Sequence, residues 1–241
     1  MRIKSFFLNQ LGVVLLTASL YSVAEEADRD WRDYQENVLA HQAEIAGWCN
    51  KEKARRMMDL IYEVKPNLCV EVGVFGGSSI YPTASALKFL DQGLVCAIDP
   101  WKHSNCLEGY AVDDPNYQWW SQVNLEQILQ GFTRMLNRFK LKPYCHVMRM
   151  TGLKALDEFA DESIDILHID GNHTSDSALS DAEMYLPKVK KGGYIWFDDV
   201  NWESTNKACE FLKERCVKNS AFSTDEYYLF YNSSPIAQTV K

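Results

Sequence analysis

The stretch 164–200 decides the fold, and it reads IDILHIDGNHTSDSALSDAEMYLPKVKKGGYIWFDDV. It begins with the apolar run 164–169 and closes on a second apolar run, 194–197. A polar, helix-compatible segment, 174–186, lies between them and ends at Pro187 and the glycine pair that follows. A strand, a crossover helix and a second strand form the repeating unit of a parallel sheet. The stretch therefore predicts a parallel α/β fold.

Both predicted strands end in acids, at the edge where open parallel sheets bind their ligands. Asp170 follows the first strand, and Asp198 and Asp199 follow the second. His173 lies one short turn past Asp170. Adjacent strands would bring the three carboxylates together, and these repel each other unless a cation or raised pKa values relieve the charge. A hard divalent cation would do so, whereas each acid alone is equally well explained as a helix cap or a turn residue.

Upstream, the segment NLCVEVGVFGGSSI predicts a strand over 67–72, a tight glycine turn, and a helix over 78–90. The turn contains Gly73, Gly76 and Gly77. Glycines allow the backbone to approach a ligand closely, and the helix start directs N–H groups towards it. A glycine turn alone is a weak indication, but here the strand and the helix flank it as a nucleotide-type site requires.

The next predicted strand, 94–98, ends in Asp99. An acid at this point binds a pair of ribose hydroxyls in Rossmann-like folds, and we favour this role over that of a turn former before Pro100. Further strands are expected at 144–148 and 226–231, and further helices at 119–139, 153–159 and 204–215. The fold class predicted is Rossmann-like and doubly wound: a mostly parallel seven-stranded sheet with an antiparallel C-terminal strand pair.

Composition narrows the function classes. The chain has 241 residues, enough for one α/β domain with a sizeable core. A net charge of -8 argues against nucleic acid as a partner. The seven cysteines are irregularly spaced and lack a CxxC pair, so we expect reduced thiols and neither a disulfide framework nor a zinc site. The sequence is compatible with a homo-oligomer.

The N-terminus has the layout of a signal peptide over residues 1–24. Arg2 and Lys4 precede an apolar stretch, 11–20, and a small-residue cleavage pattern ends at Ala24. We expect export and, after cleavage, no stable membrane span. An uncleaved anchor or an amphipathic start is the alternative, because two polar residues interrupt the apolar region. The predicted domains are this signal peptide, a helical lead-in or lid over 25–65, and the Rossmann-like domain over 66–241.

With the segments EVGVFGGSS, AIDPW, HIDGNH and KGGYIWFDD, the chain resembles class I S-adenosylmethionine-dependent methyltransferases over about 66–231. More narrowly, it is similar to the small O-methyltransferase family that includes macrolide-sugar enzymes. It also resembles the metal-dependent catechol and caffeoyl-CoA O-methyltransferases. The resemblance implies methyl transfer from S-adenosylmethionine to a hydroxyl of a small acceptor, with Mg2+ as a second cofactor.

The resemblance also implies residue roles. Asp99 would bind the ribose of the cofactor, and Thr151 and Gly152 would flank its adenine. The methionine end would be lined by Glu71, Gly73, Gly76, Gly77 and Ser78. Mg2+ would be bound by Asp170, Asp198 and Asp199. The catalytic residues would be His173, as the general base, and Asp170. Catechol enzymes carry lysine at the position of His173 and asparagine at that of Asp199. These differences favour a sugar or polyol-like acceptor.

The implied chemistry is an in-line displacement, in which the protein mainly aligns donor and acceptor. A chelated Mg2+ would lower the pKa of the acceptor hydroxyl. His173 is suited to take its proton at neutral pH, because an ordinary histidine pKa is about 6.5. A satisfied surface histidine at a helix start is the alternative.

Two other functions compete. A nicotinamide-dependent Rossmann oxidoreductase would explain the glycine turn and Asp99, but it would not explain the three acids. Its usual G-x-G-x-x-G pattern is also absent, since two residues separate Gly73 from Gly76. An exported, non-catalytic binding protein on a methyltransferase fold would explain the N-terminus, because S-adenosylmethionine is a cytoplasmic metabolite. The N-terminus and the cofactor thus indicate different compartments.

Overall fold

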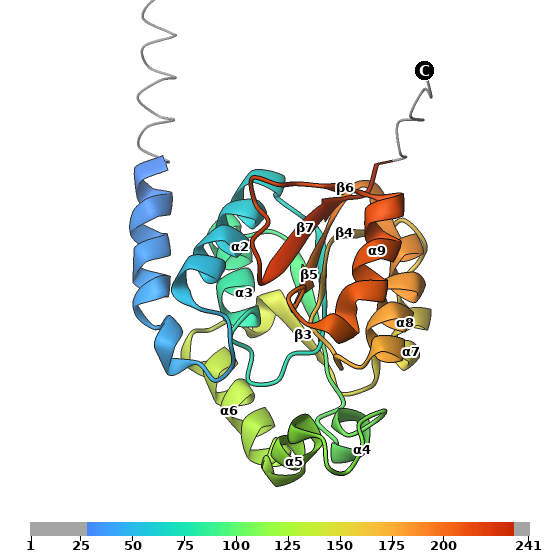
Figure 1. Ribbon diagram of the computed structural model, residues 1–241. Helices are drawn as coiled ribbons and strands as arrows, with labels where there is room; N and C mark the ends of the chain where they lie inside the picture. Colours follow the sequence, from blue (N-terminus) through green and yellow to red (C-terminus); the bar gives the residue numbers. More distant parts are fainter. Residues whose placement is uncertain (1–27, 234–241) are drawn as a thin grey trace, which may run out of the picture.

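Seven strands form one sheet in the computed structural model (Figure 1), which describes residues 28–233. The strand order is β3-β2-β1-β4-β5-β7-β6. Their bounds are β1 Leu68–Val72, β2 Leu94–Ile98, β3 Cys145–Met148, β4 Ile164–Ile169, β5 Val189–Asp198, β6 Val217–Lys218 and β7 Tyr227–Tyr231. The first five strands pair in parallel, and β7 is antiparallel to both β5 and β6. The predicted fold class is confirmed.

Helices cover both faces because successive side chains of a buried strand point to opposite sides. Figure 1 shows α2 and α3 on one side of the sheet and α8 and α9 on the other. One core contains side chains from α2 Lys51–Val64, α3 Ile80–Leu90 and α6 Leu125–Arg138. The second contains side chains from α7 Gly152–Ala155, α8 Ser175–Tyr185 and α9 Asn206–Arg215. Neighbours in β1 divide accordingly: Cys69 belongs to the first core and Val70 to the second.

The excursion after β2 carries two short helices, α4 His103–Cys106 and α5 Pro115–Gln122. The single helix expected over 119–139 is wrong, because α5 ends at Gln122 and α6 begins only at Leu125. Asn124 lies between them and its side chain accepts a hydrogen bond from the backbone N–H of Gln127 at 3.0 Å. Such a cap satisfies a free N–H at a helix start, which favours a new helix over a continuous one.

Strand β5 is longer than expected. The pair Gly192-Gly193, expected to follow the crossover helix as a breaker, lies inside the strand. Gly192 N–H donates to Asn232 O and Asn232 N–H donates to Gly193 O, both at 2.8 Å, so the chain beyond β7 continues the pairing. Ser204 is likewise not the N-cap of α9. It lies in the 3-10 helix η5 Glu203–Thr205, directly before α9.

The lead-in is an integral part of the core. Residues 28–40 are helical, followed by the 3-10 helix η1 Gln42–Glu44 and an irregular segment before α2. Trp31 stacks on Tyr62 with ring centroids 4.4 Å apart, which fixes the first helix against α2. The expected signal peptide lies outside the described residues. Within residues 28–233, no helix is long and apolar enough to cross a membrane.

Candidate functional site

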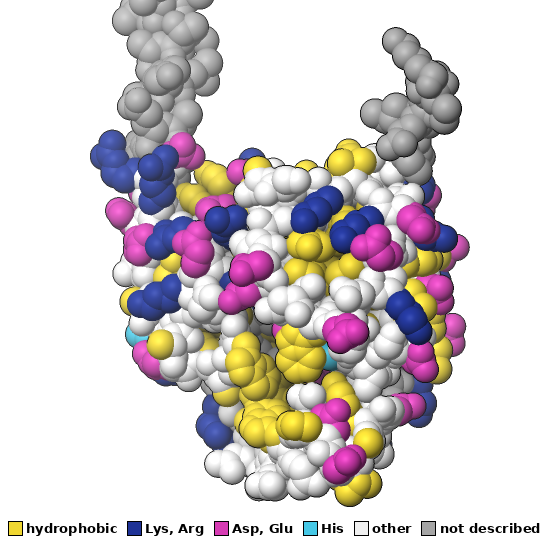
Figure 2. Space-filling view, in the orientation of Figure 1, with side chains coloured by type: hydrophobic (Ala, Val, Ile, Leu, Met, Phe, Trp, Pro, Cys, Tyr) yellow, Lys and Arg dark blue, Asp and Glu magenta, His cyan; other side chains and the backbone are white. Residues whose placement is uncertain are grey.

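A cavity of about 1000 Å3 lies at the carboxyl ends of the parallel strands. It is lined by residues from the glycine turn and from the segments that follow β2, β3, β4 and β5, and also by Trp48 and Lys53 of the lead-in. Figure 2 shows hydrophobic side chains gathered in the middle of this face, above α5. This volume lies at the upper end of the range for ligand pockets, so a donor and a small acceptor can share the cavity.

The glycine turn brings β1 and β4 into close contact. Gly73 has a φ of 89°, and a Cβ added there would lie 1.9 Å from the carbonyl oxygen of Asp170. Gly77 has a φ of 83°, and its Cβ would meet the ring of Phe132 at 2.4 Å. Only glycine fits both the backbone conformation and the space at these positions. The turn thereby brings Val74 and Phe75 into the lining of the cavity.

The predicted cofactor residues divide into two groups. Gly73, Ser78, Asp99, Thr151 and Gly152 line the cavity. The other three, Glu71, Gly76 and Gly77, do not line it. Glu71 is buried beneath the turn, where its carboxylate accepts a hydrogen bond from the Ser79 hydroxyl at 2.6 Å and contacts the His168 ring at 3.0 Å.

Asp99 is held rigidly at the cavity. Its Oδ2 accepts hydrogen bonds from the N–H groups of Val74 and Phe75, each at 3.0 Å, and its Oδ1 accepts one from Trp101 N–H at 2.7 Å. Burial raises the pKa of Asp99, although these backbone hydrogen bonds oppose the shift. A carboxylate fixed by three N–H donors keeps further lone pairs for hydroxyl donors, as ribose recognition requires.

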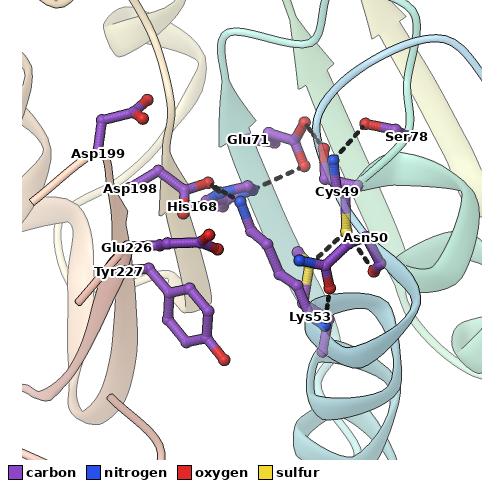
Figure 3. A network of polar contacts seen from close by, with 12 residues as sticks. Cys49, Asn50, Lys53, Glu71, Ser78, His168, Asp198, Asp199, Glu226 and Tyr227 are labelled. Carbon is purple, nitrogen blue, oxygen red and sulfur yellow. Dashed lines mark hydrogen bonds and ion pairs between the residues drawn. The ribbon is translucent and has the colours of Figure 1, made fainter. Parts of the chain in front are cut away.

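The three acids of the predicted metal site lie in two groups that share Asp170. Among the described residues, the possible ligand atoms of each group lie within 4.8 Å of one another. One group is His168, Asp170 and Asp198, and the other is Asp170, His173 and Asp199. Asp199 has a φ of 55°, so the chain turns sharply after Asp198. Figure 3 shows Asp198 in contact with His168 and Lys53, and Asp199 apart from both.

The negative charge of the Asp198 carboxylate is balanced by side chains of the protein itself. Its Oδ2 contacts the His168 Nε2 at 2.7 Å and also accepts a hydrogen bond from the Lys53 Nζ. Burial would lower the pKa of His168, but the carboxylates of Glu71 and Asp198 outweigh it and raise that pKa to about 10. Burial likewise opposes the charge on Lys53, yet Asp198 raises the pKa of the lysine. The network therefore alternates two anions with two cations.

Sequence reasoning missed both cations of this network. Lys53 occupies the first turn of an amphipathic helix, where a lysine is expected to face water. His168 gave a usable indication, since it interrupts an apolar run that becomes a buried strand. A buried histidine needs partners for both ring nitrogens, which predicts acids nearby.

His173 lines the cavity beside Asp199. Its Nε2 lies 2.9 Å from Asp199 Oδ2, and its ring contacts Trp202 edge-on at a centroid distance of 5.0 Å. Burial would lower the pKa of His173, but the hydrogen bond to Asp199 outweighs this and raises it. With Nε2–H donating to the carboxylate, Nδ1 is the nitrogen left to accept a proton.

Asp181 is a further cavity residue that the sequence did not indicate. It lies on α8 and lines the cavity. Its two oxygens approach Gly152 and Gly171, where an added Cβ would meet them at 3.3 and 2.9 Å. Burial raises the pKa of Asp181 to about 7. An acid on a half-polar helix looks like a surface residue in the sequence, so only the packing reveals it.

Four aromatic side chains, here called the aromatic wall, also line the cavity. It consists of Trp48, Phe75, Trp119 and Trp120. The ring centroids of Trp48 and Phe75 lie 4.9 Å apart, and those of Trp119 and Trp120 lie 4.8 Å apart. Trp48 is 66% exposed and Trp119 is 45% exposed, so both present ring surface that no other part of the described chain covers.

The comparisons with known proteins agree with this geometry. The family model described as "Methyltransferase domain" matches residues 70–200, which is more than half of the chain. An uncharacterized protein of Sinorhizobium fredii, y4gI, is 26% identical over 144 residues, covering 59% of this chain. The match spans only 14% of that protein's length.

Solved structures share the fold at low identity. A putative caffeoyl-CoA O-methyltransferase from Staphylococcus aureus has a TM-score of 0.58 at 15% identity, with 91% of this chain and 100% of that chain covered. The O-methyltransferase from Bacillus cereus, in complex with SAH, has a TM-score of 0.55 at 15% identity, covering 82% and 89%. Together with the family match, they show that this chain belongs to the methyltransferase domain family and has the class I S-adenosylmethionine-dependent methyltransferase fold.

Proposed function

We propose that the protein transfers the methyl group of S-adenosylmethionine to a hydroxyl of a small sugar or polyol-like acceptor. One observation carries the proposal: a single cavity joins the glycine turn and Asp99 at one end to Asp170, His173 and Asp199 at the other. The first end fits a nucleoside and the second end fits an alcohol that must lose a proton. Both reactants can therefore lie side by side in one cavity, which is what an in-line transfer needs.

The cofactor half would bind by backbone approach and by Asp99. The glycine turn lets the methionine end of the cofactor lie against the backbone near Ser78. Asp99, oriented by Val74 and Phe75, would accept hydrogen bonds from the ribose hydroxyls. Thr151 and Gly152 would flank the adenine at the start of α7.

His173 would remove the proton of the acceptor hydroxyl. Asp199 fixes the ring through Nε2 and strengthens the base at Nδ1, as a carboxylate does for histidine in other acid–base sites. Asp170 lies in the same group and would bind a second oxygen of the acceptor. Transfer of the proton to His173 would accompany attack of the oxygen on the methyl carbon, while the bond from that carbon to the sulfonium breaks and S-adenosylhomocysteine leaves.

The residues at this end fit a divalent ion. Asp170 and Asp199 offer carboxylate oxygens close together, which is the donor type that Mg2+ prefers. Asp198 fits less well, because its carboxylate is already bound by Lys53 and His168. Mg2+ bound there would supply Lewis-acid chemistry that favours the ionised acceptor.

The lining favours a hydroxylated ring or chain as the acceptor. Acids on one side accept hydrogen bonds from hydroxyls, and the exposed faces of Trp48 and Trp119 can stack on the apolar face of a sugar. A purely apolar acceptor would leave lone pairs of Asp170 and Asp199 without hydrogen-bond donors, which costs binding energy.

The test begins with the cofactor. Isothermal calorimetry with S-adenosylhomocysteine should show one site in the full-length protein. Methyl transfer from labelled S-adenosylmethionine is then measured on a panel of sugars and polyols, with catechol as the contrasting acceptor. Absence of cofactor binding, or transfer to catechol alone, would contradict the proposal.

Export of the protein is a separate proposal that rests only on residues 1–24. Fusing this segment to a reporter that is active outside the cytoplasm tests it. An inactive reporter, with full-length protein in the cytoplasm, would remove the conflict with a cytoplasmic cofactor.

A further inference from the structure

Lys53 reaches the acids from outside the segment that matches the family model, residues 70–200. It lies in the first turn of α2, where the Asn50 side chain accepts a hydrogen bond from the Lys53 backbone N–H at 2.9 Å. The remainder of α2 is anchored in the core by buried residues such as Met58. The helix therefore aims one fixed lysine at the ends of the strands (Figure 3).

The lysine and Asp198 form a buried ion pair. The Lys53 side chain is 10% exposed and that of Asp198 is 4% exposed. Oδ2 of Asp198 receives both Lys53 Nζ and His168 Nε2, and His168 Nδ1 lies 3.0 Å from Glu71. Buried charges are tolerated when they are paired and hydrogen-bonded, as in this chain of four residues. Asp198 thus has its counter-charges before any ion binds.

We propose that Lys53 is a built-in cation that holds Asp198 and keeps a divalent ion off this carboxylate. An ion bound to Asp198 would lie beside the ammonium group, where like charges repel strongly in a buried site. An ion would then be bound through Asp170 and Asp199 without the third carboxylate. Fewer anionic ligands give weaker binding. The inference rests on the proposed metal and acceptor site, and it assigns Lys53 as a positioning residue of that site.

Metal affinity tests the inference without turnover. Mn2+ replaces Mg2+ as the probe, and free Mn2+ is measured by electron paramagnetic resonance in the full-length protein with saturating S-adenosylhomocysteine. The wild type should bind Mn2+ weakly, with a dissociation constant of about 0.1 mM or above, as sites with few charged ligands do. Lys53→Met frees Asp198 as a ligand, so binding should tighten by about tenfold or more.

Two control variants sharpen the comparison. Lys53→Arg keeps the cation and should bind Mn2+ as the wild type does. Lys51→Met removes an exposed positive charge from the same helical turn and should also change little. A general loss of positive charge would instead tighten binding equally in both methionine variants, which would overturn the specific role of Lys53.

Asp198→Asn provides the reciprocal measurement. With Lys53 in place, Asp198 is not a ligand, so this variant should keep the wild-type Mn2+ affinity within about twofold. A tenfold loss would overturn the inference, and so would an unchanged affinity in a folded Lys53→Met variant. If both variants fail to fold, as judged by circular dichroism, the wild type decides: a micromolar dissociation constant counts against the inference.

The proposed function can fail separately. A wild type that does not bind S-adenosylhomocysteine contradicts the methyltransferase proposal. Unchanged Mn2+ affinity in a Lys53→Met variant that binds S-adenosylhomocysteine normally contradicts the role of Lys53 alone.

Discussion

The two ends of the cavity are built differently. At the cofactor end, Asp99 is oriented by backbone N–H groups of the adjacent glycine turn. At the acceptor end, Asp198 and Asp199 are neighbours in sequence yet have different partners, Lys53 with His168 for one and His173 for the other. The orientation of Asp99 depends on the backbone conformation of the glycine turn. The partners of Asp198 and Asp199 depend on which distant helices and strands pack together. Mutations should therefore separate the two ends cleanly.

The largest effect is expected at the acceptor end. His173→Ala should lower kcat by roughly 100-fold or more, the scale on which a general base contributes. S-adenosylhomocysteine affinity should stay within about twofold, because the ring belongs to the other end of the cavity. Steady-state kinetics with an acceptor from the panel, together with calorimetry, measure both. Normal turnover in this variant would remove the base role.

The pH profile tests the same pair. Only the neutral His173 ring can accept a proton, so kcat should rise as pH rises through its raised pKa. Asp199→Asn removes the hydrogen bond that raises this pKa, so the rising limb should move to lower pH. A limb that stays in place would mean that another group controls the profile.

At the cofactor end, Asp99→Ala should weaken S-adenosylhomocysteine binding by roughly 10- to 100-fold, since hydrogen bonds to a charged group contribute about 1.5 to 3 kcal/mol. Metal affinity should not change, because Asp99 belongs to neither acid group. Calorimetry on the folded variant measures the S-adenosylhomocysteine affinity, and Mn2+ titration measures the metal affinity. Asp99→Asn serves as the conservative control and should lose less.

Asp181→Asn should stabilise the protein without ligand. Since burial raises the folded pKa of Asp181 to about 7, above its unfolded value of about 3.9, stability is lost as pH rises between these values. The neutral side chain avoids that loss, so the gain should be about 2 to 4 kcal/mol at pH 8 and vanish near pH 4. Urea unfolding measures it. Glu183→Gln, an exposed change on the same helix, should stay within about 0.5 kcal/mol.

The smallest effect is expected at the aromatic wall. Trp119→Ala should raise the acceptor KM several-fold and leave kcat nearly unchanged, because stacking contributes to acceptor binding before and during transfer alike. Val112→Ala removes an exposed apolar side chain of the same excursion that does not line the cavity, and it should have no effect. A fall in kcat for Trp119→Ala would place this ring closer to the reacting atoms.

Much of the fold follows from the sequence because its determinants are local. The runs 94–98 and 164–169 are strands with the bounds expected. Errors arose where long-range pairing extended an element, as in β5, or where a single cap divided a helix, as at Asn124. A local sequence pattern does not show which residue pairs with Gly192 in the sheet. It also does not show whether the Asn124 cap starts a new helix or the preceding helix continues.

The sequence by itself determined which functional groups follow the successive strands. These are the glycine turn, then Asp99, then the acids and His173. Tertiary structure alone decided how those acids are used. Lys53 and Asp198 are 145 positions apart, and their contact exists only because α2 packs against the sheet in the shared core. The physical reason is that a strand end fixes where a carboxylate lies, while its charge state and free lone pairs depend on whatever the packed fold places within hydrogen-bonding distance.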